Sequence, residues 1–186
     1  MILVEGVSDQ IAVEALARAE GRDLDALQVA VVPTGGAHAI GRFVVRLGPA
    51  GAGLRLVGLC DAGEEPVVRR AIARAGADVP VFVCDTDLED ELIRAVTPAG
   101  VQTLLGAHGD LGSFRTLQKQ PYWRDRPVQA QLQRFFASGS TRKLRYADKL
   151  VIAATEFGRV PAPLQQALSA ATECGGTPCG ALRDSG

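Results

Sequence analysis

Met1-Ile-Leu-Val-Glu-Gly-Val-Ser-Asp9 opens the chain, and this stretch decides the fold. Its apolar run, residues 2–4, ends abruptly in Glu5 and Gly6, and a helical pattern begins at Ser8 or Asp9. This order predicts a strand, a tight turn and a helix. Glycine allows a sharp turn and the close approach of a ligand. Open α/β proteins place their sites at such turns, beyond the carboxyl ends of parallel strands.

Length and composition narrow the class of protein. The chain has 186 residues, 47% of them apolar, which suits one domain with a sizeable core or a domain with an appendage. The net charge is -1, so any nucleic-acid-binding surface must be local. No apolar run approaches the roughly 20 residues of a membrane span, and the N-terminus lacks a signal-peptide pattern. We expect a cytoplasmic protein with no membrane partner, in which Cys60 and Cys84 are buried thiols.

Four short apolar runs alternate with helical patterns through residue 96. The runs are 2–4, 29–32, 54–60 and 79–84, and the helical patterns between them are 9–21, 40–47 and 67–75. The connections are long enough for crossovers, which predicts a parallel sheet of right-handed β-α-β units. The runs lack polar alternation, as expected of strands buried on both faces. Pro80 near the start of the fourth run indicates an edge strand.

The second half of the chain contains helical patterns and no strand pattern. The predicted helices are 98–105, 112–118, 127–136, 141–157 and 161–171. The Gly-rich end, residues 173–186, has little to bury and is predicted to be disordered. We therefore expect an α/β core over residues 1–97, a helical extension over 98–172 packed on that core, and a disordered tail.

Acidic residues follow three of the four predicted strands. The carboxyl ends of parallel strands share one sheet edge, so these side chains should converge, and like charges at one point disfavour ionisation unless a cation is bound. Mg²⁺ prefers carboxylate and water ligands and leaves room for a phosphate. One or two such ions could polarise a phosphodiester and activate a water. The candidate metal ligands are Glu5, Asp9, Asp61, Asp85, Asp87 and Glu89.

Helix capping is the alternative interpretation of these acids. Ser8 or Asp9 would cap the first helix and Asp87 the fourth, and each acid taken singly is more often a cap or a solvated residue. Glu5 fits this interpretation least, because glutamate is a poor N-cap. No Ser-His-Asp or Cys-His pattern competes as a catalytic group. The repeated placement after three strands favours a metal site.

These residues together resemble the Toprim domain, which topoisomerases, bacterial primases and the nucleases of the overcoming lysogenization defect (OLD) family share. The resemblance rests on Glu5-Gly6 after the first strand, on Asp61 at a strand end and on the later acidic strand end. The phrase Leu3-Val-Glu-Gly-Val-Ser-Asp9 is most similar to the OLD nucleases. The resemblance implies a Rossmann-like Toprim fold and an endonuclease that uses Mg²⁺ or Mn²⁺, one or two ions, to cleave DNA.

The resemblance also assigns roles to individual acids. Glu5 would be a metal ligand or general acid/base, and Asp9 the second carboxylate one helical turn later. Asp61 would be the first acid of an Asp-x-Asp pair whose second position is Gly63 here, which weakens a topoisomerase or primase assignment. The segment Asp87-Leu-Glu89 would supply a second metal site, with Asp85 as an extra ligand.

A basic segment completes the implied site. In the OLD branch a lysine from the helical region reaches the active site, and Ser138-Gly-Ser-Thr-Arg-Lys143 resembles its carrier. Lys143 would then stabilise charge on the scissile phosphate, and Arg142 and Arg145 would hold the nucleic-acid backbone. The alternative is a solvated lysine near a helix start.

Two further features each have two interpretations. The Gly35-Gly36 loop would either present backbone N–H groups to a phosphate or form a plain strand-to-helix turn; it is not a Walker motif, so we expect no ATP site. Phe114, Tyr122 and Trp123 would either stack on bases or, as we favour, form the seam between the helical extension and the sheet.

Substrate and partners stay open at this point. OLD nucleases usually carry an ATPase domain ahead of the Toprim domain, whereas this chain begins on the first predicted strand, so a separate ATPase partner or a simplified relative is expected. The alternatives to a DNA nuclease are a non-catalytic module that binds nucleic acid or an ATPase, an RNA-processing nuclease and a small-molecule phosphohydrolase. The sequence does not determine the oligomeric state.

Overall fold

The computed structural model describes residues 1–172, apart from the side chain of Ser140. The predicted disordered tail, residues 173–186, lies outside the described residues. The four predicted strands are present: β1 (Ile2–Val4), β2 (Val31–Pro33), β3 (Val57–Asp61) and β4 (Val81–Cys84). They form one parallel sheet in the order β2-β1-β3-β4, which confirms the predicted fold class and the edge position of the strand after Pro80.

The helices follow the predicted pattern with small shifts at their ends. They are α1 (Val7–Ala19), α2 (Ile40–Leu47, after a 3₁₀ turn at Ala37–Ala39), α3 (Glu65–Arg74), α4 (Leu88–Val96), α5 (Pro98–Ala107), α6 (Leu111–Gln118), α7 (Val128–Ala137), α8 (Ser140–Glu156) and α9 (Ala162–Thr172). Among residues 1–172, no helix is both long and apolar enough to cross a membrane.

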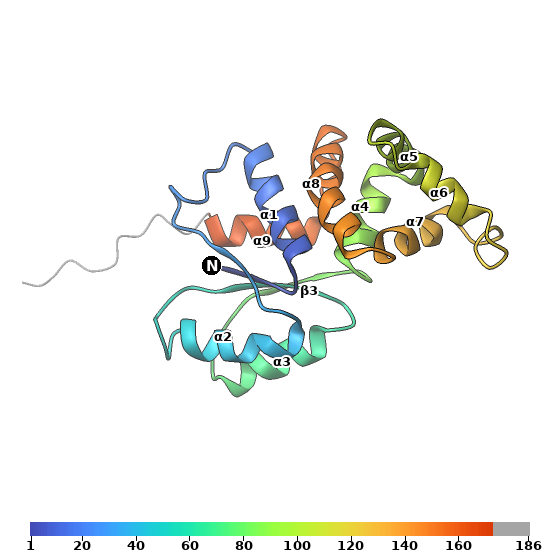
Figure 1. The fold of residues 1–186 in the computed structure, drawn as a ribbon. Helices are drawn as coiled ribbons and strands as arrows, with labels where there is room; N and C mark the ends of the chain where they lie inside the picture. The colour runs from blue at the N-terminus through green and yellow to red at the C-terminus, as the bar shows by residue number, and fades with distance from the viewer. Residues whose placement is uncertain (173–186) are drawn as a thin grey trace, which may run out of the picture.

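Successive residues of the strands face opposite layers of helices, as the lack of polar alternation predicted. Ile2 and Val4 belong to the apolar cluster on the face covered by α1 and α9, and Leu3 belongs to the cluster formed with α2 and α3 (Figure 1). The sheet is therefore the middle layer of three. The apolar clusters on its two faces are separate, and the carboxyl ends of its four parallel strands lie at the same edge.

The helical extension shares its core with the sheet. One apolar cluster contains Val4 of β1, Leu16 of α1, Val151 of α8 and Leu168 of α9. Helix α8 packs along α1, and α9 lies against β1, β3 and β4. The division at residue 97 stays a prediction, and the apolar cluster runs across it.

Helix α1 starts earlier than predicted, and this changes the role of its first residues. Its N-cap is Gly6, not Ser8 or Asp9. The chain bends at Glu5 and Gly6 between β1 and α1, as predicted, but the backbone of Gly6 is extended, with φ of -137°, so the bend does not use the left-handed conformation that favours glycine. Asp9 lies in the first turn, and its Oδ2 accepts a hydrogen bond from the Gly6 N–H at 2.8 Å. At the other end, Gly21 has φ of 69° and terminates the helix as predicted.

The two cysteines of the sheet are free and buried, as expected. Cys60 lies in β3 and Cys84 in β4, next to the acidic strand ends. Burial, followed by the charges of Glu5 and Asp61, raises the pKa of the Cys60 thiol to about 12. This thiol is therefore protonated near neutral pH and acts as a packing group.

Candidate functional site

Glu5 leaves β1 at the sheet edge, and its backbone is fixed by the Gly35-Gly36 loop. The N–H groups of Gly35 and Gly36 both donate to the Glu5 carbonyl oxygen at 3.0 Å. The two glycines have φ of 80° and 106°, a region that favours glycine. These two amides are thus occupied within the chain. The structure supports the plain-turn interpretation of the loop and not the phosphate-binding one.

The Glu5 side chain joins the ends of β1 and β3. Its Oε1 accepts a hydrogen bond from the backbone N–H of Asp61 at 3.3 Å. Partial burial raises the pKa of Glu5, this hydrogen bond opposes the rise, and the nearby charges of Glu64 and Glu89 add to it. The carboxylate is therefore held at the edge with a weakened preference for the ionised form.

Asp61, the last residue of β3, is the most perturbed acid of this edge. Burial raises its pKa first, and the charges of four neighbours raise it further, to about 7; these neighbours are Glu5, Asp9, Asp87 and Glu89. Among residues 1–172 no basic side chain forms an ion pair with Asp61. The structure thus brings five of the six predicted metal ligands within electrostatic reach of one another. We call these five residues the acidic edge.

Lys143 faces the acidic edge from the first turn of α8. Its Nζ lies 2.9 Å from Glu89 Oε1, in the first turn of α4. Burial alone would lower the pKa of Lys143, but the charge and hydrogen bond of Glu89, with Asp9 and Asp61 behind it, outweigh burial and raise it. Burial raises the pKa of Glu89 as well, despite the lysine. The raised pKa of Lys143 reflects the acids around it, whereas that of Glu89 reflects burial first and the charges of Asp9 and Asp87 only after it.

Asp87 serves as a helix cap at the same edge. Its Oδ1 accepts the backbone N–H of Asp90 at 2.7 Å, so the capping interpretation holds for this residue. Its charge nevertheless contributes to the raised pKa of Asp61. Asp87 can therefore stabilise α4 and belong to the acidic edge, since a capping carboxylate has a second oxygen.

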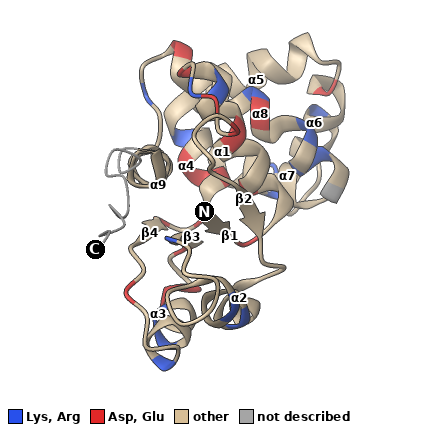
Figure 2. Ribbon diagram, turned by 90° about the vertical axis from the view of Figure 1, so that its left-hand side faces the viewer, with Lys and Arg blue, Asp and Glu red and all other residues tan. Residues whose placement is uncertain are grey.

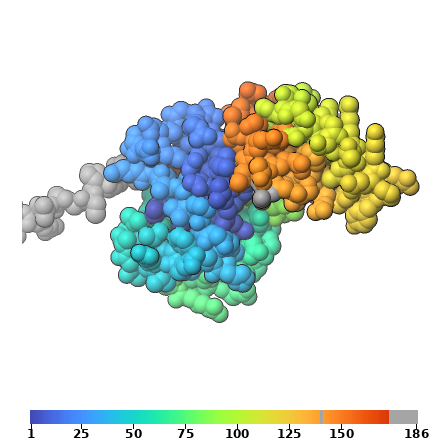
Figure 3. Space-filling view, in the orientation of Figure 1, coloured from blue at the N-terminus to red at the C-terminus, as the bar shows by residue number. Residues whose placement is uncertain are grey.

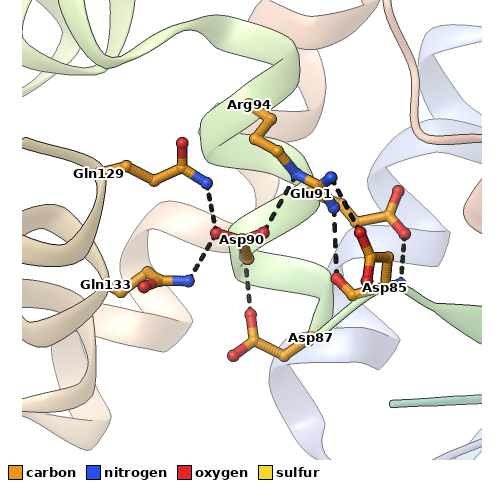
Figure 4. A network of polar contacts seen from close by, with 7 residues as sticks. All are labelled: Asp85, Asp87, Asp90, Glu91, Arg94, Gln129 and Gln133. Atoms are coloured by element: carbon orange, nitrogen blue, oxygen red, sulfur yellow. Dashed lines mark hydrogen bonds and ion pairs between the residues drawn. The ribbon is translucent and has the colours of Figure 1, made fainter. Parts of the chain in front are cut away.

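A buried aspartate that the sequence analysis missed ties this edge to the helical extension. Asp90 is only 6% exposed, and its Oδ1 accepts hydrogen bonds from Gln129 and Gln133 of α7, both at 2.5 Å (Figure 4). Its Oδ2 pairs with Arg94 Nε at 3.1 Å. The spacing of the two glutamines, one helical turn apart, was the available signal, but nothing in the sequence connects them to Asp90.

Asp85 is not part of the acidic edge. Its side chain is 79% exposed, and its Oδ2 pairs with Arg94 Nη1 at 3.1 Å (Figure 4). Its backbone N–H donates to Glu91 Oε1 at 2.7 Å. The turn after β4 thus directs Asp85 toward α4, so the structure does not support its predicted role as an extra metal ligand.

Arg142 and Arg145 are both engaged within the chain. Arg142 donates to the Phe135 carbonyl oxygen at 2.7 Å and to Ser138 Oγ at 2.9 Å, with its guanidinium 3.9 Å from the centre of the Phe135 ring. Arg145 forms an ion pair with Asp110. The structure gives both arginines a role in fixing the start of α8, and it does not present them as free phosphate-binding groups.

The acidic edge fits a hard cation by its chemistry. Within residues 1–172 no three His, Cys, Asp or Glu side chains are already arranged around a metal position. The reason is visible in the contacts, since Glu5, Asp9 and Glu89 each turn toward an N–H group or Lys143. Partly buried oxygens that raise one another's pKa are the donors that Mg²⁺ or Mn²⁺ would relieve of repulsion.

Comparison with known proteins places this geometry in a family context. Residues 1–61 match the family model described as overcoming lysogenization defect protein-like, TOPRIM domain. These residues are therefore similar to the OLD-like Toprim domain. The Toprim match ends at Asp61 and includes Glu5 and Asp9, whereas Glu89 and Lys143 lie beyond it.

Solved structures extend the Toprim likeness to nearly the whole chain. The C-terminal region of the Burkholderia pseudomallei OLD protein superposes with a TM-score of 0.68 at 20% identity, covering 94% of this chain and 96% of that one. The C-terminal region of the Xanthomonas campestris pv. campestris OLD protein gives 0.65 at 23% identity, covering 94% of each chain. No curated protein matched the sequence. The fold is thus that of an OLD C-terminal Toprim region, as the sequence led us to expect.

Proposed function

We propose that the protein is a metal-dependent endonuclease that cleaves phosphodiester bonds of DNA at its acidic edge. One observation carries the proposal: four carboxylates surround Asp61 at the carboxyl end of a Toprim sheet, and Lys143 faces them. Such an excess of acid is costly without a cation and suits a site that binds metal and phosphate together.

The acids divide into two groups that would hold one or two ions of Mg²⁺ or Mn²⁺. Glu5, Asp9 and Asp61 come from β1, α1 and β3, and Asp87 and Glu89 come from the start of α4. A bound ion of this kind polarises the scissile phosphate and lowers the pKa of an attacking water.

The residues of the chain supply the remaining chemistry. Lys143 would exchange its contact with Glu89 for a phosphate oxygen, where a cation stabilises developing charge. Glu5, whose pKa is raised, would hold or accept a proton beside the reacting water. The Asp61–Glu5 hydrogen bond keeps the two acids in register across the edge.

A non-catalytic Toprim module is the second candidate. Gly63 stands where the Asp-x-Asp pattern has its second acid, and Asp85 is directed away from the edge, so the acid set is smaller than expected. Such a module would bind nucleic acid or a separate ATPase without cleavage. Calorimetric titration with Mn²⁺ and Mg²⁺ distinguishes the nuclease from the non-catalytic module, because the module requires no affinity for metal.

Plasmid cleavage tests the leading proposal. Supercoiled DNA with Mg²⁺ or Mn²⁺ should be nicked or linearised by the wild type, and Glu5→Gln should slow this by roughly a hundredfold or more. Glu156→Gln, an exposed change at the far end of α8, is the matched control and should cut normally. Equal cutting by the wild type and Glu5→Gln would overturn the role of Glu5. Competing DNA against structured RNA in one reaction decides between the DNA nuclease and the RNA-processing alternative.

A further inference from the structure

Charge is segregated between the two parts of the chain. Residues 1–97 contain 15 acidic and 9 basic side chains, whereas residues 98–172 contain 4 acidic and 10 basic ones. Lys and Arg occur along α6, α7 and the segment between them (Figure 2). The near-neutral net charge of the chain therefore conceals a basic helical extension beside an acidic sheet, and such a local surface is what nucleic-acid binding requires.

The turn between α6 and α7, residues 119–127, concentrates exposed basic and aromatic groups at the tip of the extension (Figure 3). Tyr122 is 67% exposed, and the guanidinium of Arg126 lies 5.0 Å from the centre of its ring. Lys119 and Arg124 are also exposed. The turn has one acidic residue, Asp125, whose Oδ2 lies 3.3 Å from Arg124 Nε. We call residues 119–127 the α6–α7 turn.

The aromatic residues of this region now separate into two kinds. Phe114 is fully buried, with 0% exposure, and Trp123 packs on the core while meeting the Tyr122 ring edge to face at 5.1 Å. Phe114 meets the ring of Phe135 in α7, so these two aromatic residues pack within the helical extension, and the predicted seam with the sheet stays a prediction. Tyr122 differs, because most of its surface faces solvent, and the part of its ring that Arg126 and Trp123 leave exposed can stack on a base.

A buried glutamine holds the α6–α7 turn in shape. Gln131 is 3% exposed and donates to the carbonyl oxygens of Trp123 at 2.7 Å and Arg126 at 3.0 Å. Its own Oε1 accepts a hydrogen bond from Gln118 at 2.8 Å. A surface whose backbone is fixed before binding loses less entropy when a ligand arrives.

Helix α7 lies in the chain between this turn and the start of α8, which carries Lys143. It has 10 residues, which corresponds to about 15 Å. Asp90 anchors the same helix to α4 through Gln129 and Gln133. At about 3.4 Å per nucleotide, α7 alone has the length of roughly four or five nucleotides of a stacked strand.

We propose that the α6–α7 turn binds an unpaired nucleic-acid strand that continues along α7 toward the acidic edge. One base stacks on Tyr122, and Lys119, Arg124 and Arg126 contact the phosphates. Base stacking on an aromatic side chain tolerates any sequence, so the site adds affinity and position without base preference. This inference rests on the proposed function for its geometry, but strand binding at the turn requires no cleavage.

Binding of labelled oligonucleotides in EDTA tests the turn separately from catalysis. For single-stranded oligo-dT, Tyr122→Ala should weaken binding by roughly five- to a hundredfold. The same change should have little effect on an abasic strand of equal length, which has phosphates but no bases. Phe157→Ala, an exposed aromatic at the C-terminal end of α8, is the matched control and should bind as the wild type does.

Salt dependence tests the phosphate contacts. The double change Arg124→Ala and Arg126→Ala should reduce the slope of log affinity against log salt by roughly one to two. Arg70→Ala, an exposed arginine of α3 on the opposite face of the sheet, should leave the slope unchanged. The same binding measurements with oligo-U in place of oligo-dT compare RNA with DNA as the bound strand.

Several results would overturn the inference. They are unchanged oligo-dT binding by Tyr122→Ala, an equal loss with the abasic strand, an equal loss with Phe157→Ala, or tighter binding of duplex than of single strand. If Tyr122→Ala fails to fold, Tyr122→Phe and Tyr122→Ser decide, because only the serine variant should lose stacking. Because EDTA removes the metal that cleavage requires, the binding assay reports on the turn alone, and failure of the nuclease proposal is distinguished from failure of this one.

Discussion

Two neighbouring strands, β3 and β4, each lead into an aspartate, and the two aspartates have opposite surroundings. Asp61 closes β3, and Asp85 follows β4, which pairs with β3 along the sheet. Asp61 faces four other acids and has a pKa raised to about 7. Asp85 is turned outward and paired with Arg94. An acidic residue after a strand is therefore only a candidate site residue, and the helix that follows determines whether its side chain joins the site.

The deciding element is α4. Arg94 on its last turn reaches back to Asp85, while Asp87 and Glu89 on its first turn extend the acidic edge toward Asp61. The macrodipole of α4 favours acids at its start and a cation at its end, so one helix explains both outcomes. Four changes break or sharpen this contrast, and they are ordered here from the largest expected effect.

Neutralising the two aspartates should separate them most clearly. Asp61→Asn is expected to slow metal-dependent DNA cleavage by roughly a hundredfold or more, because it removes a central acid of the edge. Asp85→Asn should stay within about twofold of the wild type, since its partner is Arg94. Initial rates of plasmid nicking measure both. A comparable loss in Asp85→Asn would show that the β4 end also serves the site.

Removing the buried carboxylate that supports α4 should lower stability. Asp90→Ala leaves two glutamines of α7 without this acceptor and removes one of the two carboxylate partners of Arg94, and we expect a loss of about 2–4 kcal/mol in the free energy of unfolding. Urea unfolding measures the change. Asp125→Ala, an exposed aspartate, is the control and should cost less than about 0.5 kcal/mol. Equal losses would mean that Asp90 is no anchor.

Adding the missing acid should strengthen the β3 end. A side chain at Gly63 meets no atom within 4 Å, so Gly63→Asp can be accommodated. We expect a roughly tenfold gain in Mn²⁺ affinity, because the number of charged ligands tunes such sites. Calorimetric titration measures it, with Gly112→Asp, another glycine with open space around it, as the control. Unchanged affinity would indicate that the metal position lies away from residue 63.

Stability against pH should report the crowding around Asp61. Its folded pKa of about 7 exceeds the ordinary value of 3.8, so the folded state holds a proton that the unfolded chain releases. Stability from this group is therefore lost as pH rises from about 4 to 7. Without metal, Asp61→Asn should raise the melting temperature by roughly 2–4 °C at pH 8, and by less at pH 5. The reverse trend would contradict the raised pKa.

The fold was predictable because its signals are local and repeated. Four β-branched runs with helical patterns between them fix a parallel sheet, and Pro80 identified its edge. Helix ends were less certain: α1 begins at Val7 because Asp9 accepts the Gly6 N–H from within the helix instead of capping it from outside. Cap geometry depends on backbone angles that residue types do not specify.

The site was predictable where it follows strand ends and not where it depends on long-range partners. Glu5 and Asp61 lie together because parallel strands share an edge. The contact of Lys143 with Glu89 joins residues 54 positions apart, and a family resemblance suggested it where no pattern could. The ion pairs of Asp85 with Arg94 and of Arg145 with Asp110 were missed, because a sequence does not show in which direction a charged side chain points.

The packing of α9 on the sheet has a consequence for the order of synthesis. Leu164, Ala167 and Leu168 belong to the same apolar cluster as Ile2, yet the ribosome makes them more than 160 residues later. Until they emerge, the part of this sheet face that α9 covers stays exposed and apolar. That part of the nascent sheet would thus remain open, or be covered by a chaperone, through most of translation. The first strand to be synthesised, β1, which leads into Glu5, is therefore fully packed only after α9, the last helix described here, has been synthesised.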